Sequence, residues 1–280
     1  MPDGLAGTGR QVEIAFAGAA GERTFLRRQR VAYPFHLGRA LYLPGDPVEF
    51  CTVYLQSCSG GIFQKDRLGL AFTAGPRACA HLTTAASTVV HTMLEDHAEQ
   101  DVLIRADEGA FVEYLPDPLI LFPDVRLRNT VTVRAHPDAT VVVADSFLAH
   151  DPSDAGRSFD WLRSETRVED EGGALLAADR FAIGGRQLAA AQVGIQGTAT
   201  MQASLMVVQR SRPGDALAAL RSALPDDGVV YAGASLLPGG AGAWMRLLSA
   251  DAVALRRVVR DAWSRVRECF AGSAPGIRRK

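Results

Sequence analysis

The chain has 280 residues, of which 48% are hydrophobic and 22% are charged, as is typical for a folded globular protein with a sizeable core. Its 30 basic and 31 acidic residues give a formal net charge of −1, so the composition offers no general electrostatic case for binding nucleic acid or an anionic membrane. No run approaches the ~18 apolar residues of a membrane-spanning helix, and residues 1–11 lack the basic and apolar regions of a secretory signal.

The cysteines give no sign of a metal cage or of a disulfide framework. Cys51, Cys58, Cys79 and Cys269 are scattered along the chain, and no two of them form a C-x-x-C pair. Together with the absence of a signal sequence, this pattern predicts a reduced, cytoplasmic protein.

In chain order, the first two-thirds of the sequence is typical of strands separated by turns. Residues 11–18 (QVEIAFAG) and 48–56 (VEFCTVYLQ) are rich in β-branched and aromatic residues. Residues 101–115 and 127–147 each predict a hairpin, with turns at residues 107–109 and 136–138, and residues 166–185 predict a third hairpin with its turn at 170–173.

Two helices are expected late in the chain. Residues 214–225 predict a short helix that ends at Pro225. In residues 251–270, apolar side chains recur at helical spacing while Arg256, Arg257, Arg260 and Arg267 fall largely on the other side. Asp251 is the expected N-cap and Gly272 the expected stop.

These elements predict a mainly β fold, with many short strands in a sandwich-like or solenoid-like arrangement and a few helices, including one at the C-terminus. No linker rich in serine or proline divides the sequence. We therefore expect a single domain over residues 1–280.

The segment LQSCSGGIFQKDRLGL (residues 55–70) is the first candidate for chemistry. A phosphate loop needs the pattern G-x-x-x-x-G-K-[ST], but here Lys65 follows Gly61 by four positions and Asp66 comes next. A nucleophile at Cys58 would need a base that the sequence does not place beside it. The Gly60–Gly61 pair instead favours a tight turn, because glycine permits a positive φ.

Histidines and carboxylates leave further alternatives open. His81, His91 and His97 lie close together in the sequence, but six residues of a strand region need not place His91 and His97 on the same side. Asp66, Glu113, Asp117, Asp145 and Glu165 are candidates for paired acid–base catalysis, although no pair among them is favoured by sequence alone.

Five phrases in register carry a resemblance to a known family. They are YLQSCSGGIFQKDRLGL, HLTTAASTVVHTM, FVEYLPDPLILFPDVRL, VVVADSFLAHDP and LLAADRFAIGG, and they occur in that order. Together they resemble the UreD (also called UreH) family of urease accessory proteins, most clearly over residues 30–185. The chain departs from the family pattern at four positions: the family usually has proline where this chain has Cys58, glycine at Lys65, lysine at Val89 and tyrosine at His91. These departures indicate a divergent branch of the family.

The resemblance implies a non-enzymatic role as a metallochaperone scaffold. Such a protein binds the apo-urease subunits and UreF, meets the GTPase UreG through UreF, and supports nickel delivery to urease. No tightly bound cofactor is expected, and Ni²⁺ would be held only in transit. A dimer of heteromeric complexes is one assembly compatible with this role, and neither nucleic acid nor a membrane is an expected partner.

The resemblance also gives a hypothesis for the site. Asp66 matches the aspartate of the family's Gly-Asp pair, Thr88 follows the threonine pair, and Asp145 lies in the strand that contributes an inner carboxylate. We expect these three side chains to line a polar route for nickel, with Gly60 and Gly61 as turn residues; the alternative is that Asp66 braces the turn and Asp145 is a buried, paired carboxylate. A β-rich scaffold for another metal-centre assembly system and a carboxylate-dependent hydrolase remain alternative functions.

Overall fold

The computed structural model describes residues 9–19, 21–192 and 196–276. The ends of the predicted domain, including most of the opening segment that lacks a signal pattern, lie outside the described residues. None of the helices in those ranges combines the length and hydropathy that a bilayer crossing would need.

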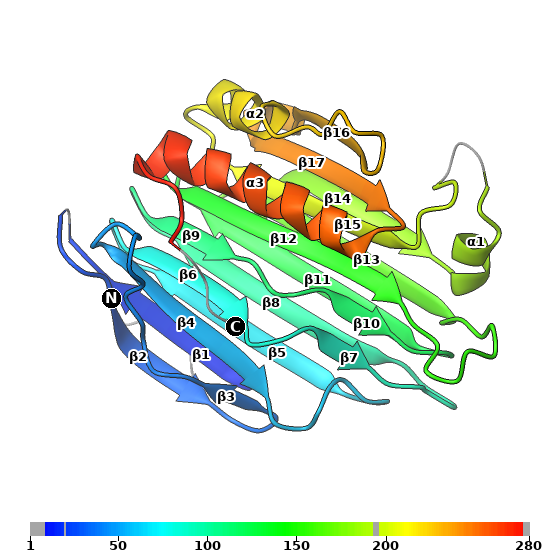
Figure 1. The fold of residues 1–280 in the computed structure, drawn as a ribbon. Coiled ribbons are helices and arrows are strands. Elements are labelled where there is room, and N and C mark those ends of the chain that lie inside the picture. Colours follow the sequence, from blue (N-terminus) through cyan, green and yellow to red (C-terminus); the bar gives the residue numbers. More distant parts are fainter. Residues whose placement is uncertain (1–8, 20, 193–195, 277–280) are drawn as a thin grey trace.

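Most of the described chain forms two β-sheets (Figure 1). Within the described ranges, the first sheet has seven strands in the spatial order β14 (Leu175–Ile183), β13 (Trp161–Glu169), β11 (Arg126–Ala135), β8 (Ala98–Ala106), β5 (Arg67–Ala74), β1 (Val12–Ala17) and β2 (Phe25–Val31).

The second sheet has ten strands among the described residues. Eight follow the order β16 (Tyr231–Leu236), β17 (Gly242–Ser249), β15 (Met201–Val208), β12 (Thr140–Ala149), β9 (Phe111–Tyr114), β6 (Cys79–Thr84), β4 (Phe50–Ser57) and β3 (Phe35–Leu37). The short strand β10 (Leu119–Leu121) pairs in parallel with β12 and with β7 (Thr88–Val90).

The middle of the chain winds between the two sheets in stacked coils. It passes from β4 to β5, from β6 to β8, from β9 to β11 and from β12 to β13, each time changing sheet. Strands one coil apart pair in parallel, as β5 with β8 and β6 with β9. The predicted mainly β fold is therefore confirmed, with features of both a sandwich and a solenoid.

Two of the three predicted hairpins are wrong. The turns at residues 107–109 and 136–138 carry the chain from one sheet to the other, so β8 and β9 do not pair, nor do β11 and β12. Each of these strands finds its partners in the neighbouring coils instead. Only the third prediction holds, because β13 and β14 pair antiparallel around residues 170–173.

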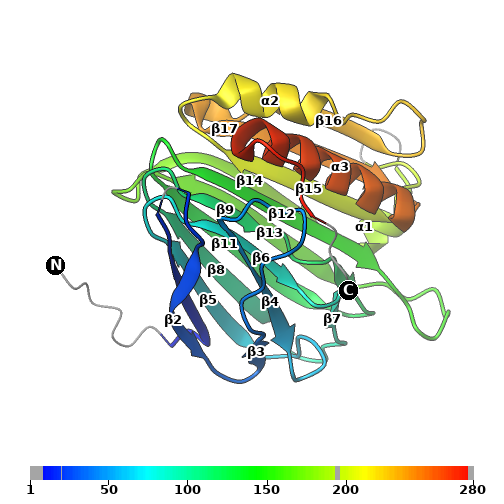
Figure 2. The same cartoon turned by 60° about the vertical axis from the view of Figure 1, so that its left-hand side comes forward.

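The described helices are α1 (Gly185–Ala189), α2 (Pro213–Arg221) and α3 (Ala252–Ala271), with a 3-10 turn η1 (Pro238–Gly240). Figures 1 and 2 show α2 and α3 together on the ten-stranded sheet. The C-terminal helix is confirmed with its predicted caps: the Asp251 carboxylate accepts hydrogen bonds from the Val253 and Ala254 amides, and Gly272 ends the helix at φ +77°. The other predicted helix ends earlier, at Arg221 rather than Pro225.

Two apolar cores follow from this layering. One lies between the sheets and the other between the ten-stranded sheet and helices α2 and α3. Strand β12 serves both: Val143 and Phe147 belong to the first core, whereas Val142 and Ala144 belong to the second. Because side chains alternate along a strand, Asp145 faces the space between the sheets.

Candidate functional site

The turn after β4 has the backbone conformations that its glycines permit. Gly60 has φ +83° and Gly61 φ +151°, and a Cβ on Gly61 would lie 2.3 Å from the carbonyl oxygen of Val89. The imidazole of His91 lies against the same turn, with its Nε2 3.3 Å from the Gly60 carbonyl oxygen and its ring stacked on Phe63 at 4.3 Å. The turn therefore presses directly onto the segment that contains Val89 and His91.

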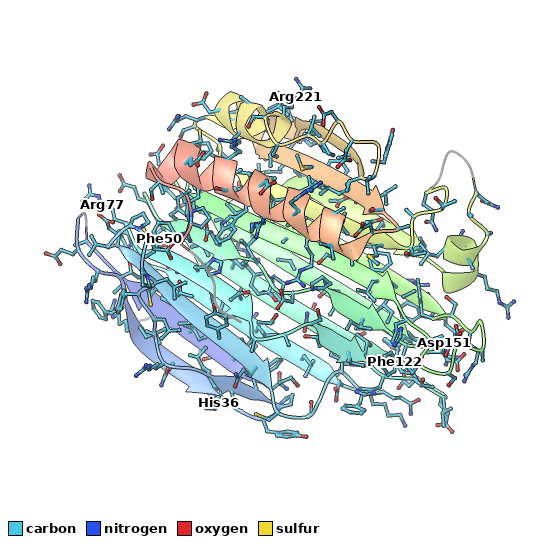
Figure 3. All side chains as sticks on the ribbon, viewed as in Figure 1. His36, Phe50, Arg77, Phe122, Asp151 and Arg221 are labelled. Carbon is cyan, nitrogen blue, oxygen red and sulfur yellow. The ribbon has the colours of Figure 1, made fainter. Side chains whose placement is uncertain are left out.

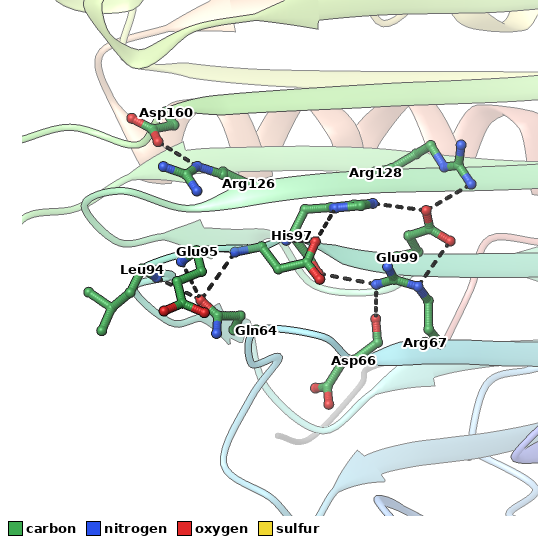
Figure 4. A network of polar contacts seen from close by, with 11 residues as sticks. Gln64, Asp66, Arg67, Leu94, Glu95, His97, Glu99, Arg126, Arg128 and Asp160 are labelled. Atoms are coloured by element: carbon green, nitrogen blue, oxygen red, sulfur yellow. Dashed lines mark hydrogen bonds and ion pairs between the residues drawn. The ribbon is translucent and has the colours of Figure 1, made fainter.

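Asp66 closes the end of this turn. Its carboxylate accepts a hydrogen bond of 2.8 Å from the Phe63 amide, and its own amide donates to the Phe63 carbonyl oxygen at 3.1 Å. Its carbonyl oxygen accepts from the side chain of Arg67 (Figure 4). This is the geometry of the bracing alternative for Asp66.

A cavity of about 390 Å³ lies between the two sheets behind this turn. Its wall contains Gly60, Gly61, Thr88 and Asp145, residues that the sequence hypothesis placed in one site. Asp66 is not among the residues that line it. The structure thus brings together four of the five residues of the hypothesis, and Asp66 reaches the cavity only through the turn that it closes.

Asp145 is one of two carboxylates in the cavity wall, the other being Asp117. It is half-buried on β12, and its Oδ2 accepts a hydrogen bond from the Ser164 hydroxyl of β13, in the opposite sheet. Burial raises the pKa of Asp145 above its ordinary value, and the nearby charge of Asp179 raises it further, while the bond from Ser164 and the charge of Arg246 act the other way. Its negative charge is therefore only partly compensated.

The opposite wall of the cavity is polar as well, since Gln100 of β8 and Asn129 of β11 line it. Ser164 of β13 lies in register with them and contacts the cavity through its bond to Asp145. The Gln100 amide donates a hydrogen bond of 3.1 Å to the Asn129 side-chain oxygen. Sequence reasoning missed these residues, although each interrupts the inward-facing apolar positions of its strand.

A second polar row continues from Asp145 along the inner face of the ten-stranded sheet. Asp145 is in register with Ser204 of β15, and Ser204 with Arg246 of β17. The Arg246 guanidinium donates to both carboxylate oxygens of Asp179 at 2.7 Å, which joins the two sheets. Asp179 belongs to the phrase LLAADRFAIGG, but no role was predicted for it.

A larger groove of about 840 Å³ lies beneath α3, on the other face of the ten-stranded sheet. It shares Pro116, Asp117, Ala144 and Ser146 with the inter-sheet cavity. At this place β12 pairs with β9 as far as Val143 and resumes with β10 at Phe147. The groove and the cavity therefore adjoin across a break in the pairing of the sheet.

A buried ionic cluster holds the C-terminal helix α3 against the face of the ten-stranded sheet that this helix covers. Arg267 donates to both oxygens of Glu113 and, at 2.7 Å, to Asp46, and its guanidinium lies 4.0 Å from the ring centroid of Phe50, a residue labelled in Figure 3. The prediction that Arg267 lies on the exposed side of the helix is wrong, since it is fully buried. The cause is Glu113, whose charge compensates the desolvation of the guanidinium.

Glu113 is the centre of this cluster. Its oxygens also accept from the Trp263 indole at 2.6 Å and lie 2.6 Å from Nδ1 of His81. Although burial raises the pKa of Glu113, the bond with His81 and the charge of Arg267 together lower it to about 2. Glu113 is thus a structural anion in the second core.

The candidate carboxylates and histidines do not lie together in one site. Glu113 lies in the second core and Asp145 between the sheets, while Glu165, on the outer face of β13, pairs with Arg180 at 2.7 Å. His97 lies on the outer side of the seven-stranded sheet, with its ring nitrogens 2.8 Å from Asp96 and 2.9 Å from Glu99. In the described part of the chain, no three His, Cys, Asp or Glu side chains form a ready-made metal site.

Comparisons with known proteins extend the match beyond residues 30–185. A sequence model of the family described as UreD urease accessory protein matches residues 8–280. Urease accessory protein UreD 1 of Pseudomonas syringae pv. syringae (strain B728a) is 44% identical over 274 residues, which cover 98% of this chain and 96% of the relative.

More distant relatives have related names. Urease accessory protein UreD 1 of Methylorubrum extorquens (strain PA1) is 38% identical, with 97% of this chain and 92% of the relative covered. Urease accessory protein UreD of Haloquadratum walsbyi (strain DSM 16790 / HBSQ001) is 35% identical, with 85% and 78% covered. The chain therefore belongs to the UreD family of urease accessory proteins.

Proposed function

We propose that this chain is a cytoplasmic, non-enzymatic scaffold of urease maturation, which binds the apo-urease subunits and UreF and meets UreG through UreF. Nickel is its cargo, and the cargo passes through the inter-sheet cavity. The observation that carries the proposal is that a chain of this family has a polar cavity with the Asp145 carboxylate in its wall.

The chemistry of the cavity suits a passing cation. Carboxylate and hydroxyl oxygens, here from Asp145 and Thr88, are weaker ligands for Ni²⁺ than thiolates, so they let the ion go. The raised pKa of Asp145 reflects an under-compensated negative charge, and an entering cation would compensate it. The cavity thus attracts nickel without holding it.

The course of the route follows from the two adjoining hollows. The turn at Gly60 and Gly61 forms one part of the cavity wall, and the Leu115–Pro118 segment separates the cavity from the groove beneath α3. Asp117 belongs to both hollows and provides a second carboxylate at the crossing. In this proposal Asp66 acts indirectly, by closing the turn that shapes the wall.

Co-expression tests the function. The tagged chain is produced with its cognate urease subunits, UreF and UreG, and nickel is added before urea hydrolysis is assayed. We expect the chain to co-purify with apo-urease and UreF, and urease activation to require both the chain and nickel. Binding without any effect on urease would point to the scaffold of another metal-centre assembly system, and turnover by the isolated chain with a bell-shaped pH profile would point to a hydrolase.

A further inference from the structure

The outer face of the seven-stranded sheet carries a concentration of arginines, which we call the arginine face. The inner positions of these strands belong to the inter-sheet core, so the alternate residues point outward. Arginines outnumber carboxylates among them. The arginines are Arg28, Arg30, Arg67, Arg105, Arg126, Arg128, Arg134, Arg163, Arg167 and Arg180, and the carboxylates are Glu13, Glu99, Asp101, Glu165 and Glu169.

This face is open in the described part of the chain. Helices α2 and α3 both pack on the ten-stranded sheet, as Figures 1 and 2 show. The whole chain has a formal net charge of −1, so the positive charge of this face is a local imbalance and not a property of the composition. A local imbalance of this kind steers and orients an oppositely charged partner.

The carboxylates on the face do not neutralise it. Glu99 is shared between Arg67, at 3.4 Å, and Arg128, at 2.9 Å, as well as His97 (Figure 4). Glu165 is likewise shared between Arg180 and Arg167. Because each of these anions serves several cations, positive charge is left over.

The surplus is most evident at two places. Arg105 lies beside Arg134 and Arg10, and its pKa is lowered by burial and by repulsion from these two guanidiniums. At the other end of the face, the guanidinium of Arg163 lies 4.8 Å from the ring of the half-buried Trp161, which itself is 5.8 Å from His97. An aromatic ring beside arginines is the side-chain chemistry of interface hot spots.

We propose that the arginine face is the surface on which this chain binds a flat, carboxylate-rich surface of apo-urease; this rests on the proposed function. The interleaved carboxylates favour a protein over a nucleic acid or an anionic membrane. Asp101 and Glu165 lie in one row of the face across β8, β11 and β13, and Glu99 lies two residues from Asp101 along β8, so these acids would repel a continuous row of phosphates. A protein surface with carboxylates opposite the arginines and cations opposite the acids would match the pattern.

The test is the affinity of the chain for its cognate apo-urease at low and at high salt. Reversing two exposed charges in Arg128→Glu/Arg163→Glu should weaken binding at low salt at least about tenfold and flatten its salt dependence. The matched control, Arg221→Glu/Arg265→Glu, makes the same change of net charge at exposed positions of α2 and α3, which pack on the ten-stranded sheet (Arg221 is labelled in Figure 3), and should bind as the unmodified chain does. UreF binding and the thermal unfolding midpoint should stay unchanged in both.

A milder pair keeps the test decisive if charge reversal disturbs folding. Arg128→Gln/Arg163→Gln removes the charges without adding new ones, and should weaken binding in the same direction. Apo-urease binding by the folded glutamine variant equal to that of the unmodified chain would overturn the inference and leave the proposed function intact. Failure of the unmodified chain to bind apo-urease would remove both, and face-dependent binding of duplex DNA or phosphatidylserine vesicles in place of apo-urease would overturn the choice of partner.

Discussion

Lys65, in the turn before β5, has a backbone conformation that favours glycine. Its φ is +70°, a left-handed conformation that costs a residue with a Cβ roughly 1–2 kcal/mol. The family pattern that the sequence resembles implies glycine at this position, and glycine adopts the conformation without strain. The departure at Lys65 is therefore a local cost that the surrounding hydrogen bonds sustain, including one from its own amide to the His97 carbonyl oxygen.

Replacing Lys65 with glycine should stabilise the chain. Relief of the left-handed strain outweighs the extra freedom of glycine in the unfolded state, and leaves a gain of about 0.5–1 kcal/mol in the free energy of unfolding. Thermal or urea unfolding measures it, with Lys65→Ala as the control that keeps a Cβ at positive φ. A glycine variant no more stable than the alanine variant would contradict this explanation.

Asp145 should make the fold less stable at neutral pH than an uncharged residue would. Because its pKa is raised by burial, the folded chain binds a proton at pH values where the unfolded chain has already lost it, so the carboxylate lowers stability as the pH rises through that window. Asp145→Asn should therefore raise the unfolding temperature at pH 7. The gain should shrink as the pH falls through the raised pKa toward the ordinary aspartate pKa of about 4, and it should be absent below that value. A gain independent of pH, or a loss at pH 7, would show that this charge is compensated in the fold.

The sequence predicts the role of a single residue where its neighbours in the sequence determine that role. The caps Asp251 and Gly272 follow from the helix sequence alone. The burial of Arg267 does not, because its partner Glu113 is 154 residues away and no local pattern links them. The polar residues opposite Asp145 come from a different sheet, and the same limitation applies to them.

At the level of helices and strands, the sequence predicts where strands lie but does not predict which strands pair. A turn such as residues 107–109 has the same composition whether it closes a hairpin or carries the chain to another layer, and the difference depends on contacts with distant coils. The C-terminal helix was the clearest prediction because its apolar stripe spans the whole element. Its position on the ten-stranded sheet is fixed by the Glu113–Arg267 cluster, which only the structure reveals.

Breaking this cluster should loosen the helix. Arg267→Met leaves the buried Glu113 without its main counter-charge, which should lower the free energy of unfolding by about 3–5 kcal/mol. The control is Arg265→Met on the same helix, an exposed residue paired with Glu268, whose loss should cost less than about 1 kcal/mol. Urea unfolding compares the two variants. Similar losses for both would mean that the buried cluster does not hold α3.

The pH dependence of the same cluster has the opposite sign to that of Asp145. The pKa of Glu113 is lowered to about 2, so its contribution to stability is complete above the unfolded value of about 4.3 and is lost as the pH falls through about 2. The anchoring of this helix by Glu113 is therefore at full strength at neutral pH.

At the level of the whole molecule, the winding of the chain explains where the residues of the predicted site lie. Thr88 and Asp145 lie on strands far apart in the sequence, and the winding of the coils brings both to the wall of one cavity. Family resemblance placed them together before any spatial argument could, since spacing along the chain says nothing about two strands of a coiled sheet. The groove beneath α3 and the arginine face are properties of assembled layers, and sequence patterns alone do not predict them.

The nickel content of urease matured with an altered cavity tests the proposed route most directly. Urease is co-expressed with UreF, UreG and either the unmodified chain or Asp145→Asn, and its nickel is measured by elemental analysis after purification. If nickel passes through the cavity, Asp145→Asn should still co-purify with urease and UreF but leave urease with severalfold less nickel, while the exposed-site control Asp138→Asn should deliver the normal amount. Full nickel occupancy with Asp145→Asn would contradict a route through the cavity.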